Sequence, residues 1–395
     1  MKFFKKLGEY MTKEWSIKLF LQINKLLFLT FKLLPIRKKM TFICDFGDNA
    51  RYTIKALNDK GFKNIIVLKT TKCQEDFSDL DVHEVLSFDY QDSYAYIKGI
   101  YHLATSSKVI VDNYFPILST LPNNPRTECI QLWHAAGAIK KFALSDPSIA
   151  YRSPSAINRF RDVYERMDKI VVGSEAMSKV FRLAFHKAPD AFLRTGIPRT
   201  DFYFDEETIA ATKRQFLESY PIIDGKKVVL YAPTFRDFEL QQQKIPLNFK
   251  RIVQELGADY HILIKLHPAV AQSFTLIDDE RITILENTVA IHEVLTVTDF
   301  LISDYSSIPY EFAFFNKPQI FYPYDIEQYA MSRGFWSDYA SMVPGPVVDS
   351  DDELIHTILH LDFDLRIIED FSEKWNTYSH GTSSQNLASY LLQKS

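Results

Sequence analysis

Short apolar segments alternate with helical patterns along the chain from Met40 onward. Most of these segments are continuous runs of Val, Ile and Leu, so both faces of each predicted strand are apolar. Strands of this kind are typical of parallel sheets that helices cover on both sides. We therefore expect an α/β protein. The predicted strands are 41–46, 64–69, 82–88, 108–112, 128–133, 169–173, 227–232, 260–266, 281–286 and 300–304, with early helices near 50–60 and 94–104.

The length of 395 residues is enough for two domains of ordinary size. A composition of 46% hydrophobic and 24% charged residues, without internal repeats, is typical of globular domains. We predict the break near Gly196–Asp205, and no Gly/Ser-rich linker lies there, so the two halves are expected to pack around a cleft. The predicted parts are an N-terminal segment 1–39, domains 40–200 and 201–363, and C-terminal helices 364–395 that cross back onto the first domain.

The first 39 residues differ from the rest of the chain in charge. They hold ten Lys and Arg but two Glu, in a chain whose formal net charge is −4, so the body beyond them is acidic. This asymmetry argues against general nucleic-acid binding and for a local anionic surface as partner. The run from Leu19 to Leu34 is too short and too charged to span a membrane, and charges interrupt the apolar core that a secretory signal needs.

The same segment is rich in Phe, Leu and Ile, which favours an amphipathic helix lying in a membrane interface. A helix packed on the core of the first domain is the alternative. We favour peripheral attachment to the inner leaflet of the cell membrane, on its cytoplasmic side. The predicted membrane residues are Phe3, Phe4, Trp15, Phe20, Lys25, Phe28 and Lys32.

Polar residues gather at the carboxyl ends of the predicted strands, where parallel sheets bind their ligands. In Asp299–Phe314, DFLISDYSSIPYEFAF, Ser306 and Ser307 follow a strand and begin a helical pattern. Backbone N–H groups at a helix start, together with two hydroxyls, make an anion site. Ordinary N-capping is the alternative. Asp304 ends the strand, and Glu311 is interpreted either as an acceptor for ribose hydroxyls or as the partner of a nearby Arg.

His134 ends the strand ECIQLW and precedes the small-residue turn AAGA. A histidine in this place suits proton transfer at neutral pH. A histidine satisfied by local backbone is the alternative. Lys140 and Lys141 follow the turn, where they either add positive charge to the site or form a solvated pair.

Basic and hydroxyl side chains follow two further strands. Lys265 and His267, in IKLHP, alternate with apolar neighbours and point to the same side of a strand end. Together they suit a diphosphate whose negative charge grows as its bond breaks. Thr234 and Arg236, in YAPTFRD, are candidate donors to phosphate or nucleotide.

Two other segments are weaker candidates. In HGTSSQN, Gly381 permits a tight turn, and Thr382 and Ser383 supply hydroxyls at a helix start. A plain N-cap is again the alternative. Arg199, in GIPRTD, is weaker still because it can simply pair with Asp201.

Several motifs that define enzyme classes do not occur in the sequence: GxGxxG, the Walker loop, HExxH and GxSxG. Dinucleotide oxidoreductases, P-loop enzymes, zincins and serine hydrolases therefore lose support. The three cysteines, Cys44, Cys73 and Cys129, have neither disulfide nor metal-ligand spacing, so we interpret them as buried thiols in a reducing compartment. The candidate residues assemble anion donors without a metal cluster.

Six motifs occur in a characteristic order: QLWHAAGAIKKF, RTGIPRTDFY, VLYAPTFRD, IKLHP, DFLISDYSSIPYEF and HGTSSQN. In them the chain resembles the CDP-glycerol glycerophosphotransferases of wall teichoic acid synthesis, over roughly Thr127 to Asn386. The resemblance implies a GT-B-like fold of two Rossmann-type domains, with the donor held mainly by the second and no cofactor. It also implies a base that deprotonates the acceptor hydroxyl, and a donor site. The implied base is His134; the implied donor-site residues are His267, Ser306, Ser307, Thr234 and Arg236, with Asp304 and Glu311 at acidic positions of the same motif.

The residues after the motif histidine vary within that family. Polymerising members typically have Gly-Thr-Pro, whereas His134 is followed by Ala-Ala-Gly-Ala, which resembles the primases. The implied reaction is transfer of glycerol phosphate from CDP-glycerol to the ManNAc hydroxyl of an undecaprenyl-diphosphate-linked ManNAc–GlcNAc disaccharide, with release of CMP. Other teichoic acid enzymes are possible partners. A polymerase or second transferase, a ribitol donor, a GT-B enzyme of nucleotide sugars and a non-catalytic polymer-binding scaffold stay open, as does a divalent cation requirement.

Overall fold

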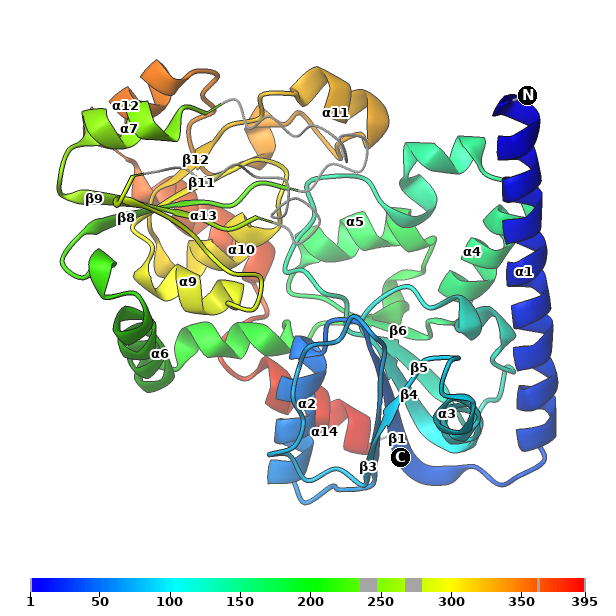
Figure 1. Ribbon diagram of the computed structural model, residues 1–395. Coiled ribbons are helices and arrows are strands. Elements are labelled where there is room, and N and C mark those ends of the chain that lie inside the picture. The colour runs from blue at the N-terminus through cyan, green and yellow to red at the C-terminus, as the bar shows by residue number, and fades with distance from the viewer. Residues whose placement is uncertain (1, 235–246, 267–278, 361–362, 394–395) are drawn as a thin grey trace.

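The computed structural model describes residues 2–234, 247–266, 279–360 and 363–393, and the side chains from Glu14 onward within them. In this part of the chain the backbone forms two parallel sheets, each flanked by helices (Figure 1). The predicted α/β class and the parallel pairing of its strands are confirmed.

The first sheet has seven strands in the order β3-β2-β1-β4-β5-β6-β7. Its register pairs Phe42 of the first strand with Val67 on one side and Ile110 on the other. All three side chains are fully buried, as the continuous apolar runs require. The strands are β1 (Arg37–Cys44), β2 (Ile65–Lys69), β3 (Glu84–Ser87), β4 (Ser106–Val111), β5 (Glu128–Gln131), β6 (Lys169–Val171) and β7 (Phe192–Leu193). The helices of this half are α1 (Lys2–Phe31), α2 (Asp48–Asp59), α3 (Ser93–Thr105), α4 (Pro154–Arg166) and α5 (Glu175–Phe185).

The second sheet has five strands in the order β10-β9-β8-β11-β12. In both sheets the strand order reverses beside the first strand, and such a reversal is where α/β proteins bind ligands. The strands are β8 (Lys227–Tyr231), β9 (Tyr260–Ile264), β10 (Ile282–Ile284), β11 (Phe300–Ser303) and β12 (Gln319–Phe321). The helices around them are α6 (Glu206–Ser219), α7 (Phe249–Leu256), α9 (Ile291–Val297), α10 (Ile308–Phe312), α11 (Ile326–Ser332) and α12 (Asp351–His360).

Elements of the two halves pack against each other at several places. A 3₁₀ helix, η5 (Pro198–Phe204), leads from the first sheet into α6. The last helices, α13 (Leu365–Asn376) and α14 (Ser383–Gln393), return to the first half, where α13 contacts α5 and α14 contacts α2 and η5. Tyr310 of α10 belongs to the core of the first half, where its ring packs on Trp375 of α13. The halves are therefore joined by side-chain packing as well as by the chain.

The start of the first sheet differs from the prediction. Strand β1 begins at Arg37, so it takes in three basic residues that the sequence assigned to the N-terminal segment. Lys39 is buried and donates to Nδ1 of His102 at 2.9 Å. Burial, together with the charge of Arg37, lowers the pKa of Lys39 to about 8. These lysine and arginine residues belong to the first residues of β1, between β2 and β4, rather than to a membrane helix.

Helix α1 presents one face to the first half and the other to the surroundings. Phe28 is 1% exposed, and Asn24 accepts a hydrogen bond from the Tyr96 hydroxyl at 2.8 Å. Phe20 packs beside Tyr96 as well. The prediction that Phe20 and Phe28 insert into a membrane is wrong, because Phe28 lies in the core of the first half and Phe20 packs against that core.

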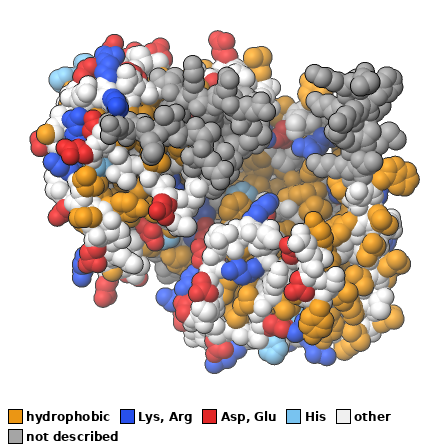
Figure 2. Space-filling model, viewed as in Figure 1, with side chains coloured by type: hydrophobic (Ala, Val, Ile, Leu, Met, Phe, Trp, Pro, Cys, Tyr) orange, Lys and Arg blue, Asp and Glu red, His pale blue; other side chains and the backbone are white. Residues whose placement is uncertain are grey.

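The opposite face of α1 is apolar and exposed. Trp15 is 68% exposed, and hydrophobic side chains gather along the edge of the molecule that α1 forms (Figure 2). Lys25 and Lys32 are exposed beside them. Phe3 and Phe4 lie outside the side chains that the structure describes. Among the described residues, no helix is both long and apolar enough to cross a bilayer.

Candidate active site

His134 lies just beyond the carboxyl end of β5, as predicted. Its ring stacks between Phe46 and Trp133, with ring centroids 4.3 and 4.4 Å away. Nδ1 is 3.0 Å from the carbonyl oxygen of Asp112. Because a carbonyl accepts and never donates, Nδ1 carries the hydrogen and Nε2 keeps the lone pair. The tautomer is therefore the one in which Nε2 can take up a proton.

Burial lowers the pKa of His134 to about 4, so the ring is neutral at pH 7. The hydrogen bond to Asp112 and the charge of Asp48 act against this shift, while Arg199 and Lys140 act with it. A neutral imidazole is the form that a general base requires. The alternative was that backbone groups form the hydrogen bonds of this histidine. Among the described residues this is true of Nδ1 and not of Nε2.

Asp112 organises the loop that faces His134. It follows β4, is 1% exposed, and accepts the backbone N–H groups of Asp45, Phe46 and Gly47 at 2.9, 3.0 and 2.8 Å. Burial raises its pKa to about 6 against the effect of these bonds. The side-chain carboxyl group of Asp112 thus positions Phe46, and the backbone carbonyl of Asp112 positions His134.

Trp133 holds an unusual backbone conformation directly before His134. Its φ is +61°, a left-handed value that a bulky side chain rarely adopts. Such a conformation costs on the order of 1–3 kcal/mol and persists where the surrounding structure enforces it. The indole packs against Phe142, Phe181 and Phe185, which fixes the ring from three sides.

The small-residue turn after His134 contacts the second half. A Cβ atom on Gly137 would lie 2.2 Å from the ring of Tyr310, so glycine is required where α10 approaches. Beyond the turn, the Lys141 N–H donates to the Gly334 carbonyl at 2.9 Å, and Lys140 Nζ donates to the Tyr329 hydroxyl at 3.3 Å. Lys140 therefore lies in the contact between the halves instead of forming a solvated pair.

The ends of β8 and β11 lie together in the second half. Asp304 accepts the N–H groups of Thr234 and Tyr305 at 2.8 and 2.6 Å, and its carboxyl group thus ties the two strand ends together. Ser306 Oγ accepts the N–H of Ile308 at 3.2 Å, a local helix-start bond. Ser307 is the N-cap residue of the five-residue helix α10 and makes no side-chain capping bond.

The structure describes one of three further residues that were predicted to bind the donor. Lys265 lies at the end of β9, where its Nζ donates to the Glu286 carbonyl at 2.6 Å and burial lowers its pKa. His267 and Arg236 lie outside the described residues.

Glu311 pairs with an arginine, which was one of its two predicted roles. Its carboxylate is 6% exposed, forms an ion pair with Arg199 and accepts the Tyr203 hydroxyl at 2.9 Å. Arg199 also pairs with Asp48 of α2. The suggested pairing of Arg199 with Asp201 is wrong, because the Asp201 carboxylate accepts backbone N–H groups at the start of α14.

The start of α14 is capped by a carboxylate from another part of the chain and not by the hydroxyls of its own segment. Asp201 accepts the N–H groups of Ser383 and Ser384 at 2.8 Å each, so a carboxylate of the chain itself lies at this helix start. Gly381 has a φ of +77°, and a Cβ atom there would lie 2.7 Å from Cβ of Phe204. The turn Gly381–Thr382–Ser383 thus fits a tight packing site between α14 and η5.

Comparison with known proteins gives the family. The model of the CDP-glycerol:poly(glycerophosphate) glycerophosphotransferase family matches residues 27–393. The chain belongs to this family. It is 36% identical over 362 residues to a teichoic acid glycerol-phosphate primase of Bacillus spizizenii, covering 90% of this chain and 93% of the relative. It is 34% identical over 358 residues to the protein of the same name from Bacillus subtilis, covering 89% and 91%.

The fold of this glycerophosphotransferase resembles that of a solved wall teichoic acid polymerase. The wall teichoic acid polymerase TagF superposes with a TM-score of 0.75 at 20% identity, and the match covers 98% of both chains. This likeness supports the GT-B-like α/β fold with parallel sheets. The family membership makes the protein a transferase.

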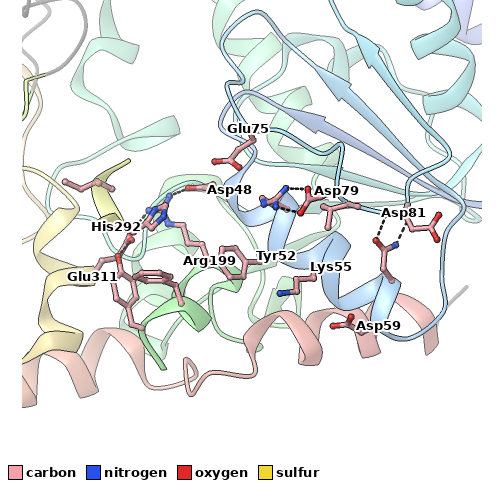
Figure 3. Close-up of a pocket in the computed structure, with 16 residues that line it drawn as sticks. Asp48, Tyr52, Lys55, Asp59, Glu75, Asp79, Asp81, Arg199, His292 and Glu311 are labelled. Carbon is pink, nitrogen blue, oxygen red and sulfur yellow. Dashed lines mark hydrogen bonds and ion pairs between the residues drawn. The ribbon is translucent and has the colours of Figure 1, made fainter. Parts of the chain in front are cut away.

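The glycerophosphotransferase also has a cavity of about 560 Å³ between α2 and the second half (Figure 3). Asp48, Arg199 and Glu311 meet at one end of it, and Lys55 and Asp59 lie farther along α2 (Figure 3). Acidic side chains outnumber basic ones in its wall: Asp48, Asp59, Glu75, Asp79, Asp81 and Glu311 against Arg51, Lys55 and Arg199.

Sequence reasoning missed the α2 residues of this wall, because a helix with mixed charges is typical of any solvated surface.

Within the described residues, no three His, Cys, Asp or Glu side chains are grouped to hold a metal ion.

Proposed function

We propose that this protein is a teichoic acid primase, which transfers one glycerol phosphate from CDP-glycerol to a lipid-linked ManNAc–GlcNAc disaccharide. The neutral His134, with its Nε2 lone pair kept for a proton, carries the proposal. The two primases that match over about nine-tenths of their own length support the choice of reaction. The sequence Ala135–Ala138 after His134 supports a primase over a polymerase.

In the proposed reaction, the acceptor hydroxyl attacks the glycerol-bearing phosphorus of CDP-glycerol in line with the bond that breaks. A new P–O bond forms to the acceptor, and CMP departs with the electron pair of the old one. Nε2 of His134 takes the hydroxyl proton. Positioning of the two substrates and stabilisation of the growing charge supply most of the rate enhancement in such transfers.

The donor diphosphate is assigned to the strand ends of the second half. The proposed donor residues are Lys265, His267, Thr234, Arg236, Ser306 and Ser307. Asp304 serves this site indirectly, because it ties the ends of β8 and β11 together. Glu311 is assigned to the contact between the halves and not to the ribose, since Arg199 and Tyr203 already take its carboxylate.

We assign the sugar part of the acceptor to the cavity beside α2. Asp48, Asp79, Asp81 and Glu311 of this wall are in ion pairs, whereas Asp59 and Glu75 have none among the described residues. Carboxylates of this kind accept hydrogen bonds from hydroxyl groups and repel phosphate, so the wall suits a neutral sugar better than the donor. Asp48 lines the cavity, and its neighbour Asn49 donates to the carbonyl of Trp133 at 3.1 Å, so the cavity lies close to the proposed base.

The exposed face of α1 is assigned to the inner leaflet of the cell membrane. Its apolar side chains include Trp15, Leu19 and Leu26, and Lys18 and Lys25 lie exposed on the same helix. Apolar side chains with flanking lysines suit an interface of anionic lipid. A lipid-linked acceptor gives this attachment a purpose.

Product inhibition tests the donor. If CMP competes with CDP-glycerol while UDP does not, the proposal stands. Competition by UDP without competition by CMP would indicate a nucleotide-sugar enzyme instead. Binding of substrate without turnover would indicate a scaffold.

A further inference from the structure

We propose that Asn49 is a positioning residue that aims His134 and links it to the second half through Arg199 and Glu311. This inference rests on the proposed role of His134 as the base. Asn49 lies in the first turn of α2 and is fully buried. Nothing in its sequence position distinguishes it from an ordinary polar residue at a helix start.

The first step concerns the residue before His134. Both backbone polar groups of Trp133 are bonded to side-chain amides: its N–H donates to Gln131 Oε1 at 2.8 Å, and its carbonyl accepts from Asn49 Nδ2 at 3.1 Å. These bonds, together with the packed indole, hold the left-handed φ of +61°. Because the peptide between Trp133 and His134 includes that carbonyl, Asn49 fixes the direction in which the chain enters His134.

The second step concerns the other end of the same amide. Asn49 Oδ1 accepts the backbone N–H of Arg199 at 2.9 Å. With its donor on Trp133 and its acceptor on Arg199, the Asn49 side chain bridges the His134 segment and η5. An aspartate of the same shape can accept from Arg199 but cannot donate to Trp133.

The third step reaches the second half. The Arg199 guanidinium pairs with Asp48 on α2 and with Glu311 on α10. Figure 3 shows Arg199 between these two carboxylates. Helix α10 directly follows Ser306 and Ser307, the proposed donor residues. A chain of contacts therefore runs from the donor side, through Glu311, Arg199 and Asn49, to the peptide before the base.

Asn49→Asp is the test, with purified full-length protein, CDP-glycerol and a soluble lipid-linked disaccharide analogue. We expect kcat to fall about tenfold to a hundredfold, as for a misplaced catalytic group, while KM for CDP-glycerol changes little. Asn49→Ala removes the bonds to Trp133 and Arg199 without burying a charge. It is the test variant if Asn49→Asp does not fold. It is expected to lower kcat in the same way.

Asn24→Asp is the matched control. Asn24 is also fully buried and also uses both ends of its amide, but it lies on the inner face of α1. We expect it to lower the melting temperature and to leave kcat unchanged. If both Asp variants lower kcat equally, or if folded Asn49→Ala keeps normal kcat, the positioning role is contradicted.

A double variant separates this inference from the proposed function. In the His134→Asn background, Asn49→Ala is expected to cause no further loss, because the two residues act on one step. Full additivity contradicts the inference. If His134→Asn alone keeps normal turnover, the proposed base is wrong whatever Asn49 does.

Discussion

In the proposed mechanism His134 is the base, and its surroundings select one protonation state. Burial keeps the ring neutral, the Asp112 carbonyl accepts a hydrogen bond from Nδ1–H, and Phe46 and Trp133 stack on the ring. In this state Nε2 is the ring atom that can accept a proton.

His134→Asn is expected to lower kcat by about a hundredfold to ten-thousandfold, because the side chain amide cannot accept the proton. CMP release under saturating substrates measures this. His356→Asn, at an exposed position of α12, is the control and is expected to leave kcat unchanged. Near-normal turnover by a folded His134→Asn protein would count against the mechanism.

A cavity carboxylate gives a second prediction at this scale. Glu75 lines the cavity, and burial raises the pKa of its carboxyl group. We expect Glu75→Gln to raise KM for the acceptor a few-fold, since an amide accepts hydroxyl hydrogen bonds less strongly than a carboxylate. KM for CDP-glycerol should not change. Initial rates with each substrate varied in turn give both KM values. A change in KM for CDP-glycerol alone would contradict the assignment of the cavity to the acceptor.

The sequence was informative for some residues of the site and not for others. His134 could be predicted because it ends an apolar strand and has small neighbours after it. Asn49 could not, because its partners Trp133 and Arg199 lie 84 and 150 residues away along the chain. An arginine partner for Glu311 was one of its predicted roles, but its identity as Arg199 was hidden, because 112 residues separate the two.

At the scale of the elements, the turn after β5 and the helix α10 fit each other closely. Gly137 leaves room for the ring of Tyr310, which is fully buried. Gly137→Ala is expected to destabilise the fold by about 1–3 kcal/mol, as overpacking typically does. Thermal unfolding measures this.

A double variant provides the control for this contact. Tyr310→Leu in the Gly137→Ala background makes room for the added methyl group, so the two changes together should cost less than their sum. If the losses simply add, the contact between the turn and α10 is not the cause.

Helix α1 divides its apolar side chains between the protein and the exposed face. Leu19→Ser together with Leu26→Ser is expected to weaken binding to vesicles that contain phosphatidylglycerol by at least about tenfold, because two exposed apolar anchors are lost. Cosedimentation measures it. Leu183→Ser changes a leucine of α5 with a similar exposure, 61%, and should not affect binding. If the wild-type protein does not cosediment with such vesicles, the proposed membrane attachment is wrong.

The elements themselves were largely predictable, with instructive exceptions. Long apolar runs gave strands within a few residues of their observed bounds, for example β8 and β9. The strands β7 and β12 were missed, because β7 has two residues and β12, Gln319–Phe321, has one polar residue among its three. The two faces of α1 could not be told apart from sequence, since both are apolar and only packing against α3 distinguishes them.

At the scale of the whole molecule, buried histidines couple stability to pH. The pKa of His134, His102 and His261 is about 4 in each case, with burial as the main cause. The unfolded chain takes up these protons below about pH 6.5, and the folded protein does not until about pH 4. Their contribution to stability is therefore lost as the pH falls from 6.5 to 4. Asp112, with its raised pKa of about 6, opposes this loss between pH 6 and 3.8.

Three such histidines outweigh one aspartate, so the melting temperature is expected to fall between pH 7.5 and 5. Thermal unfolding across this range tests it. His134→Asn should show a shallower decline, because one of the groups that titrate is gone. A melting temperature that rises on acidification would contradict the assignment of these rings as neutral and buried.

The arrangement of the two halves places the proposed base and the proposed donor residues in different parts of the chain. His134 follows a strand of the first sheet, whereas Ser306 and Ser307 follow a strand of the second. The contacts of Gly137 with Tyr310 and of Arg199 with Glu311 hold the parts together. Transfer between two substrates is the chemistry that such a division serves.

The most direct test of this account is the product formed from CDP-glycerol by purified protein, with a soluble lipid-linked GlcNAc–ManNAc acceptor present or absent. Mass spectrometry identifies the product, and released CMP gives the rate. We predict acceptor-dependent CMP release and a product with one added glycerol phosphate. A growing ladder of glycerol phosphate units, or no CMP release in the presence of acceptor, would contradict the assignment as a primase.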